Sequence, residues 1–183
     1  RPPLLQPIPT MTSFYDALET SPPEQREADL MAALPAQIDN ARKNSPAFAE
    51  ILADIDPVNI NSRAALATLP VTRKYQLQER QQAQRADNAF GGFATMGFGP
   101  GMPRVFCSPG PIYEPEGARR DYWRMARALH AAGLRAGELA HNSFSYHFVP
   151  AGSMMETGAH ALGCTVFPGG TGQTEQQVQA MAE

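Results

Sequence analysis

The sequence predicts an α/β protein with a helical N-terminal subdomain followed by a partial parallel sheet with crossover helices. Apolar residues recur at helical spacing over residues 21–82, whereas strand-like apolar runs alternate with helical segments from residue 104 onward. A glycine-rich stretch separates the two patterns. We therefore divide the chain into a proline-rich arm (residues 1–12), a helical subdomain (13–82), a Gly/Phe-rich loop (83–103) and a partial α/β domain (104–183).

Composition narrows the class of protein. Hydrophobic residues make up 43% and charged residues 18% of the 183 residues, which is typical of a globular chain. A net charge of −3 argues against non-specific nucleic-acid binding, and no apolar run reaches the roughly 18 residues of a membrane span. Cys107 and Cys164 are too few for a disulfide framework or a four-thiolate zinc site. We expect a reduced, cytoplasmic protein with no metal site, no nucleic-acid partner and no membrane partner.

Serine and proline positions predict where the front helices begin. Residues 21–24, Ser-Pro-Pro-Glu, have the form of a capped helix start with a capping box. Ser45 and Ser62 are placed to begin two further helices, and Thr72 opens a last one. Pro35 interrupts the apolar stripe of the first helix, so we expect a kink there or two shorter helices.

The stretch AFGGFATMGFGPGMP, residues 89–103, breaks both periodicities. Its glycines permit positive φ angles and close backbone approach. We interpret it as a connecting loop that packs its own side chains. The alternative is that its phenylalanines plug a pocket.

Strand-like and helical segments alternate in the back half. The predicted strands are residues 104–108, 138–144 and 164–167, and the predicted helices are residues 117–132, 152–162 and a last one that Thr174 opens. This order predicts parallel strands joined by right-handed crossovers. Ligands of such sheets lie at the carboxyl ends of the strands, here residues 108–110, 144–148 and 168–172.

Several stretches of the chain resemble one family. They are LPVTRK (residues 69–74), FGGFATMGFG (90–99), RVFCSPGPIYEPEG (104–117), AAGLRAGELAHNSFSYHFVPAG (131–152) and ETGAHALGCTVFPGGTGQTEQQVQAM (156–181). In them the sequence resembles the N-terminal portion of the phenylacetate-CoA ligase family, within the adenylate-forming acyl-CoA synthetase superfamily. The resemblance implies the front part of the large N-terminal domain of an adenylate-forming ligase.

The resemblance also implies a chemistry, that of an AMP-forming acid-CoA ligase. A carboxylic acid and ATP give an acyl-adenylate, which CoA then captures. The implied cofactors are ATP, Mg²⁺ and CoA, and the implied substrate is an aromatic carboxylic acid. The family's adenine, magnesium and catalytic-lysine motifs would follow Glu183, so we expect a fragment that is inactive alone, and we assign it no catalytic residue.

Residues 108–115 correspond, by this resemblance, to the family's ATP phosphate loop, which ends in Gly-Lys-Pro. Ser108, Gly110 and Pro115 match, but Glu114 stands where the family has the lysine, and two further prolines each remove a backbone donor. A carboxylate facing a triphosphate repels it by about 1 to 4 kcal/mol at contact distance. Two interpretations stay open. Either other residues hold ATP, or this is a non-catalytic aryl- or acyl-CoA-binding or regulatory homologue with a degenerate phosphate loop.

The segment after the second predicted strand corresponds to the wall of the family's aryl-acid pocket. Flat aromatic rings suit an aromatic acid, although each could fill the core instead. The predicted substrate-pocket residues are Phe144, Tyr146, His147, Phe148 and Gly152.

Two further features of the sequence concern the glycine-rich turn and the edge of the sheet. Residues 169–175 form a glycine-rich turn before a helix N-terminus, which can bind an anion. We favour a structural turn, because a capping box at residues 174–177 would occupy the first helical N–H groups. The unfinished sheet has an unpaired edge, which predicts a possible homodimer.

Overall fold

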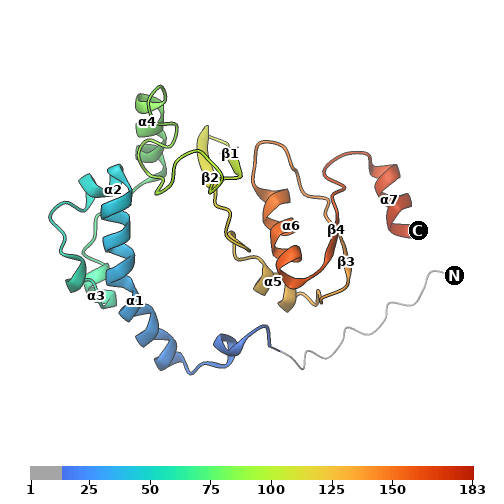
Figure 1. Ribbon diagram of the computed structural model, residues 1–183, viewed down its shortest axis with the longest axis horizontal. Helices are drawn as coiled ribbons and strands as arrows, with labels where there is room; N and C mark the ends of the chain where they lie inside the picture. The colour runs from blue at the N-terminus through green and yellow to red at the C-terminus, as the bar shows by residue number, and fades with distance from the viewer. Residues whose placement is uncertain (1–13) are drawn as a thin grey trace. The chain divides into compact units, whose positions relative to one another are not determined.

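The computed structural model describes residues 14–183, so the predicted arm at residues 1–12 lies outside the described part of the chain. Its strands and α-helices are labelled in Figure 1. The elements in chain order are η1 (Ala17–Thr20), α1 (Pro23–Asn44), α2 (Pro46–Ile51), η2 (Pro57–Asn59), α3 (Arg63–Leu66), α4 (Lys74–Gln84), β1 (Arg104–Ser108), β2 (Ile112–Glu116), α5 (Ala126–Ala131), β3 (Leu139–His141), α6 (Ala151–Leu162), β4 (Thr165–Phe167) and α7 (Thr174–Ala182). The predicted order, a helical region followed by small sheets with helices, is confirmed.

The chain forms two compact units. One is Ser21–Ala118, and the other joins residues 14–20 to Arg119–Glu183. The domain divisions drawn from the sequence stay predictions. Within residues 14–183, every helix is too short or too polar to cross a lipid bilayer.

In the unit Ser21–Ala118, α1 is one continuous helix with Pro35 inside it, so the predicted split into two helices is wrong, and the kink stays a prediction. Leu34 and Ile38 flank the proline and pack with Leu52 and Ile60 in one core. This packing holds the helix together across the hydrogen bond that proline removes.

The predicted starts of the short helices are partly confirmed. Ser45 and Ser62 cap α2 and α3, each accepting a hydrogen bond from a backbone N–H three residues on. The capping box predicted at residues 21–24 is wrong, because Pro22 is the N-cap residue of α1 and makes no side-chain cap. α4 begins at Lys74, with Arg73 as its N-cap residue rather than Thr72.

The Gly/Phe-rich loop packs against α2 and itself. Ser45 donates from its hydroxyl to the Gly92 carbonyl at 2.7 Å, and Phe93 meets Phe48 edge to face with ring centroids 5.5 Å apart. Gly92 has φ +80°, and a Cβ there would lie 3.1 Å from the Ala47 nitrogen, so this close approach requires glycine. Phe98 is 75% exposed, whereas Phe93 lines a cavity of about 600 Å³ beside α4.

Strand β1 does not join the parallel strands, which corrects the sequence prediction. It pairs antiparallel with β2, with Phe106 opposite Glu114 and Ser108 opposite Ile112. The reason is the connection: only three residues separate the strands, and a parallel crossover needs about a dozen or more.

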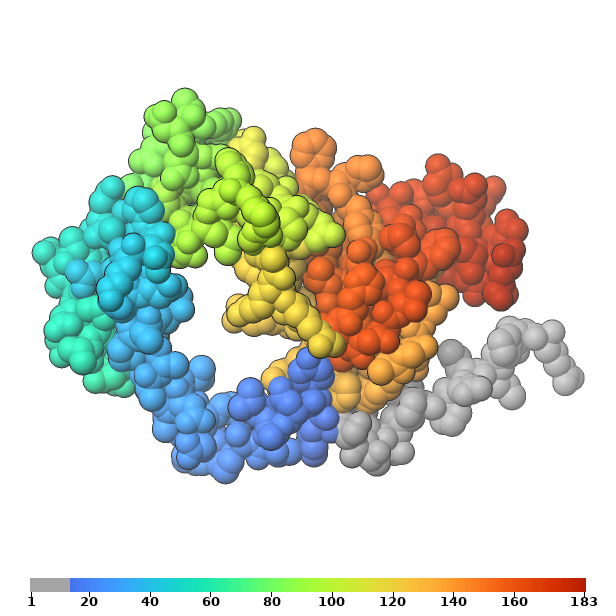
Figure 2. Space-filling view, viewed as in Figure 1, coloured from blue at the N-terminus to red at the C-terminus, as the bar shows by residue number. Residues whose placement is uncertain are grey.

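The β1–β2 hairpin is docked on α4 through a buried amide. Gln81 is 2% exposed, donates to the Tyr113 carbonyl at 2.9 Å and accepts from the Tyr113 N–H at 2.8 Å. Figure 2 shows the green atoms of α4 against the yellow atoms of this hairpin. Gln81 thus satisfies a strand's backbone groups as a neighbouring strand would.

In the second unit, β3 and β4 are parallel and are joined by α6, as predicted. α6 packs against α5 at Gly158, where a Cβ would lie 2.8 Å from the Met125 Cβ. The helix predicted for residues 117–132 is shorter, because turns occupy the chain before α5. Asp121 ends those turns by accepting hydrogen bonds from Met125 N–H at 2.8 Å and Ala126 N–H at 3.2 Å.

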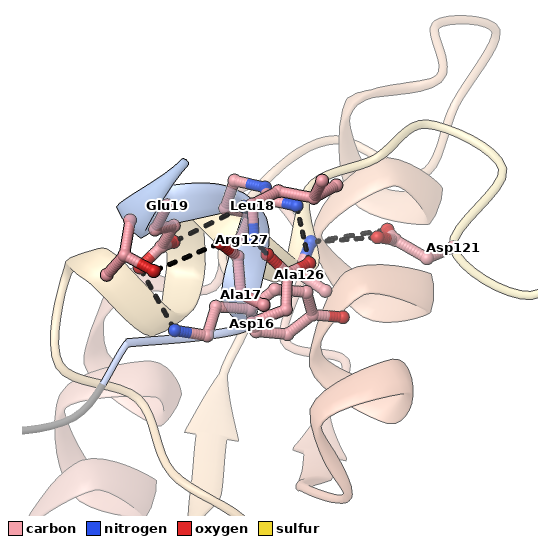
Figure 3. Close-up of polar contacts among 9 residues, drawn as sticks. Asp16, Ala17, Leu18, Glu19, Asp121, Ala126 and Arg127 are labelled. Carbon is pink, nitrogen blue, oxygen red and sulfur yellow. Dashed lines mark hydrogen bonds and ion pairs between the residues drawn. The ribbon is translucent and has the colours of Figure 1, made fainter. Parts of the chain in front are cut away.

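The segment at η1 is fixed to α5 by an ion pair. Arg127 donates to both Asp16 carboxylate oxygens, at 2.9 and 2.6 Å, and lies 3.6 Å from a Glu19 oxygen. Figure 3 shows the contacts of Asp16 and Glu19 with Arg127, and Asp121 apart from them with dashed lines to Ala126. The Arg127 guanidinium also covers the Tyr15 ring at 5.3 Å.

Candidate functional site

The carboxyl ends of β3 and β4 lie side by side, because the strands are in register up to His141 and Phe167. Asn142 follows β3, and its N–H donates to the Phe167 carbonyl at 2.9 Å. Its carbonyl accepts from the Gly170 N–H, also at 2.9 Å. The strand end that is expected to face a ligand is therefore tied to the glycine-rich turn after β4.

The Asn142 side chain holds the loop after β3 to the start of α6. It is 6% exposed, and its amide nitrogen donates to the Gly152 carbonyl at 2.9 Å and to the Tyr146 hydroxyl oxygen at 2.7 Å. Its amide oxygen accepts from the Phe144 N–H at 3.2 Å. Sequence reasoning missed Asn142. The signal for it was an amide side chain directly after an apolar strand, at a ligand-facing position.

The predicted pocket residues fall into two groups. Tyr146 and Gly152 are brought together, and a Cβ on Gly152 would lie 2.8 Å from the tyrosine ring, so glycine is required for this contact. Phe144 is 50% exposed, Phe148 is 79% exposed and His147 is also exposed. Their role as an acid pocket stays a prediction.

An apolar cavity of about 150 Å³ adjoins this strand end. Its lining comes from α5, α6, both strands and the residues that follow β3: Leu129, Leu134, Ala140, His141, Asn142, Ser143, Phe144, Met155, Ala159 and Val166. Phe144 is the one predicted pocket residue among them. The aliphatic lining suits an uncharged group, and the polar atoms lie at the strand end.

The capping box predicted at residues 174–177 is wrong. α7 has Gln173 as its N-cap residue, with φ +49° and no side-chain cap. Gln177 reaches back instead and donates to the carbonyls of Gly170, at 2.9 Å, and Gly172. The turn is thus closed by a side chain from inside the helix that follows it.

His141 joins the same network. Its Nε2 lies 3.0 Å from the Gln177 side-chain oxygen, and because that amide's nitrogen donates elsewhere, Nε2 is the donor. The ring stacks on Phe167 with centroids 5.0 Å apart. The N–H groups of Gly169 and Gly170 both donate to backbone carbonyls. This part of the turn is therefore structural, which is the interpretation that the sequence favoured.

The hairpin contains the four residues predicted as the phosphate-loop equivalent, Ser108, Gly110, Glu114 and Pro115. The Ser108 hydroxyl donates to the Glu114 carboxylate, and Gln78 donates to the Gly110 carbonyl. The prolines beside Gly110 have no N–H to offer a phosphate. These residues therefore do not fit a phosphate cradle of the Gly-Lys type.

The buried cysteine and the metal-ligating residue types of residues 14–183 add no reactive group to this site. Burial raises the pKa of the Cys164 thiol, which donates to the Arg135 carbonyl at 3.0 Å. Within residues 14–183, no group of three or more His, Cys, Asp or Glu side chains is placed to hold a metal ion.

The fold places the chain first in a class. It superposes on 2-hydroxyisobutyryl-CoA ligase in the postadenylation state with 2-HIB-AMP, at a TM-score of 0.77 and 21% identity over 87% of this chain and 35% of that one. An open conformation of the same ligase, in complex with 2-HIB-AMP and CoA, gives a TM-score of 0.78 and 22% identity over 88% of this chain and 39% of that one. The fold is that of a partial N-terminal portion of an adenylate-forming ligase.

Three sequence relatives are phenylacetate-coenzyme A ligases. The chain is 28% identical to a phenylacetate-coenzyme A ligase of Aromatoleum evansii over 177 residues and 30% identical to one of Thermus thermophilus over 179 residues. These matches cover 92% and 93% of this chain but 38% of each relative. A third, from Pseudomonas putida, is 44% identical over 59 residues, or 32% of this chain and 13% of that protein. No family model matches the chain. The predicted resemblance to the phenylacetate-CoA ligase family is confirmed.

Proposed function

We propose that the complete protein containing this chain converts an aromatic carboxylic acid into its acyl-adenylate and then into its CoA thioester. The observation that carries the proposal is the similarity to two phenylacetate-CoA ligases over more than nine-tenths of this chain. ATP, Mg²⁺ and CoA are the cofactors that this reaction requires. Cytoplasmic localisation and the homodimer stay predictions.

The strand-end cavity supports an aromatic acid as the substrate. Its volume of about 150 Å³ equals that of an engineered apolar cavity that binds benzene. Asn142 orients the Tyr146 hydroxyl beside it, and Phe144 lines it. In this proposal the apolar lining excludes water from the ring of the acid, and the strand-end amide fixes the loop around it.

The 183-residue chain by itself is proposed to be inactive. It spans 38% of the two long relatives, and its hairpin carries a hydrogen-bonded glutamate where the family has a phosphate-binding lysine. We propose that residues other than those of this hairpin hold the ATP phosphates and the magnesium ion.

The test is acid-dependent exchange of labelled pyrophosphate into ATP, measured on the complete protein with a panel of aromatic and short-chain acids. We expect exchange with aromatic acids and little with short-chain ones. The Glu114→Lys variant separates the alternatives, with Glu79→Lys, an exposed glutamate of the same unit, as the matched charge control. If folded native protein supports no exchange and only Glu114→Lys does, the proposal fails in favour of a non-catalytic acyl-CoA-binding homologue.

A further inference from the structure

The chain before and within α5 carries an excess of positive charge. The stretch RRDYWRMAR, residues 119–127, contains four arginines and one acidic residue. Arg127 is neutralised by Asp16 and Glu19, as Figure 3 shows. Among the ion pairs formed within residues 14–183, none involves Arg119, Arg120 or Arg124.

The single carboxylate of this stretch already has partners. Asp121 accepts from the N–H groups of Met125, at 2.8 Å, and Ala126, at 3.2 Å, and so covers the start of α5. Three arginines therefore accompany one carboxylate in this stretch, and that carboxylate accepts from backbone donors. The positive charge of these three arginines therefore exceeds the negative charge of Asp121.

These side chains border a shallow depression that is largely open to solvent. A cavity of about 410 Å³ is lined by Tyr15, Arg119, Arg120, Asp121, Arg124 and Ala161. Arg120 donates to the Ala161 carbonyl near the end of α6, and Arg119 donates to the Tyr122 carbonyl at 3.3 Å. Asp121 and Arg124 have φ angles of +50° and +59°. The turn that carries the arginines thus has a backbone conformation that residues with a side chain seldom adopt.

We propose that this arginine cavity binds the phosphate group of a small molecule, either a free phosphate or pyrophosphate or the phosphate of a nucleotide. The planar guanidinium fork matches phosphate oxygens with two parallel N–H donors, and several forks beside one depression favour a multiply charged anion. The Ala161 and Tyr122 carbonyls accept hydrogen bonds from Arg120 and Arg119, and so position these two guanidinium groups before a ligand binds. Phosphate binding at this site goes beyond the proposed ligase function, because binding requires no catalytic step.

A tryptophan beside the arginines can report ligand binding by its fluorescence. Trp123 is the single tryptophan of the 183 residues, lies between Arg120 and Arg124 in sequence, and meets the Tyr122 ring at 5.2 Å. The experiment is a titration of the 183-residue chain with pyrophosphate at low ionic strength, followed by Trp123 fluorescence. We expect a saturable change that weakens as salt is added.

Variants assign the change to the cavity. Arg119→Gln and Arg124→Gln are each expected to weaken pyrophosphate binding about tenfold or more, because each removes charge-assisted hydrogen bonds. Arg85→Gln, whose guanidinium lies over the Tyr113 ring in the other unit, is the matched control and is expected to leave binding unchanged. Arg119→Lys and Arg124→Lys keep the positive charge but lack the planar guanidinium group. We expect their affinity for pyrophosphate to lie between those of native protein and the glutamine variants.

Further ligands distinguish the two sources of phosphate. ADP binding tighter than pyrophosphate indicates a nucleotide, and equal affinities indicate the phosphate group alone; adenosine, which has no phosphate, is expected not to bind. The proposal is overturned if pyrophosphate gives no saturable change, or if the glutamine variants bind as native protein does. Should a glutamine variant lose its circular dichroism signal, the lysine variants decide, and native affinity in them also overturns the proposal.

Discussion

At the scale of single residues, Asn142 organises the candidate site more than any residue predicted for it. Its backbone joins the ends of β3 and β4, and its side chain joins the following loop to α6. Such a role depends on partners 4 to 28 positions away in sequence, namely Tyr146, Gly152, Phe167 and Gly170, so its position after a strand indicates the residue but not its partners.

Replacing this amide should destabilise the protein. We expect Asn142→Ala to lower the free energy of unfolding by about 2 to 3 kcal/mol, because it leaves the buried Gly152 carbonyl without its donor. Urea denaturation measures this. Asn44→Ala, an exposed asparagine at the end of α1, is the control and should change stability by less than about 0.5 kcal/mol. Equal effects of the two changes would contradict the assigned role.

At the scale of elements, connection length decides how strands pair. The turn between β1 and β2 leaves only an antiparallel hairpin possible, whereas α6 between β3 and β4 permits a parallel pair. Within residues 14–183 each strand of the hairpin pairs only with the other, and the Gln81 side chain of α4 supplies a further hydrogen-bond partner for the β2 backbone.

Removing that partner should loosen the hairpin. Gln81→Leu is expected to cost about 2 to 3 kcal/mol of stability, since the Tyr113 N–H and carbonyl both lose a buried partner. Hydrogen exchange of the Tyr113 amide should accelerate in the same variant. Gln82→Leu, the exposed neighbour on the same helix, serves as the control. Unchanged exchange at Tyr113 in Gln81→Leu would show that the hairpin is held by other contacts.

At the scale of the whole molecule, one of the two compact units is formed by segments that are far apart in the sequence. Residues 14–20 belong to the same unit as Arg119–Glu183, through an ion pair that spans 111 positions. The hydrogen bond from Arg127 lowers the pKa of the Asp16 carboxyl below its ordinary value of 3.8. Because the folded pKa is the lower one, the unfolded chain binds more protons in acid, so this stabilisation is present above the ordinary pKa and is lost as the pH falls through the folded value.

An acid-dependent stability change should follow from that ion pair. Between pH 6 and pH 3 we expect native protein to lose more stability than Asp16→Asn, which has no carboxylate to protonate. The urea midpoint at several pH values measures the difference. Asp54→Asn, an exposed aspartate of the other unit, should follow the native curve. If Asp16→Asn follows it too, the ion pair contributes nothing to the pH dependence.

The sequence by itself determined the helical front half and the α/β back half, the parallel β3–α6–β4 unit, the Ser45 and Ser62 helix starts, and the family resemblance, but not strand β2. Each depends on local periodicity, capping chemistry or a linear motif, which a chain carries without its fold. Only the tertiary structure decided that Pro35 stays within a helix, that β1 turns back on β2, and that Gln177 rather than a capping box closes the glycine-rich turn. Asn142 and the arginine cavity likewise appeared only there. The physical reason is the same in each case: packing and buried hydrogen bonds between distant residues outweigh local preferences of about 1 kcal/mol.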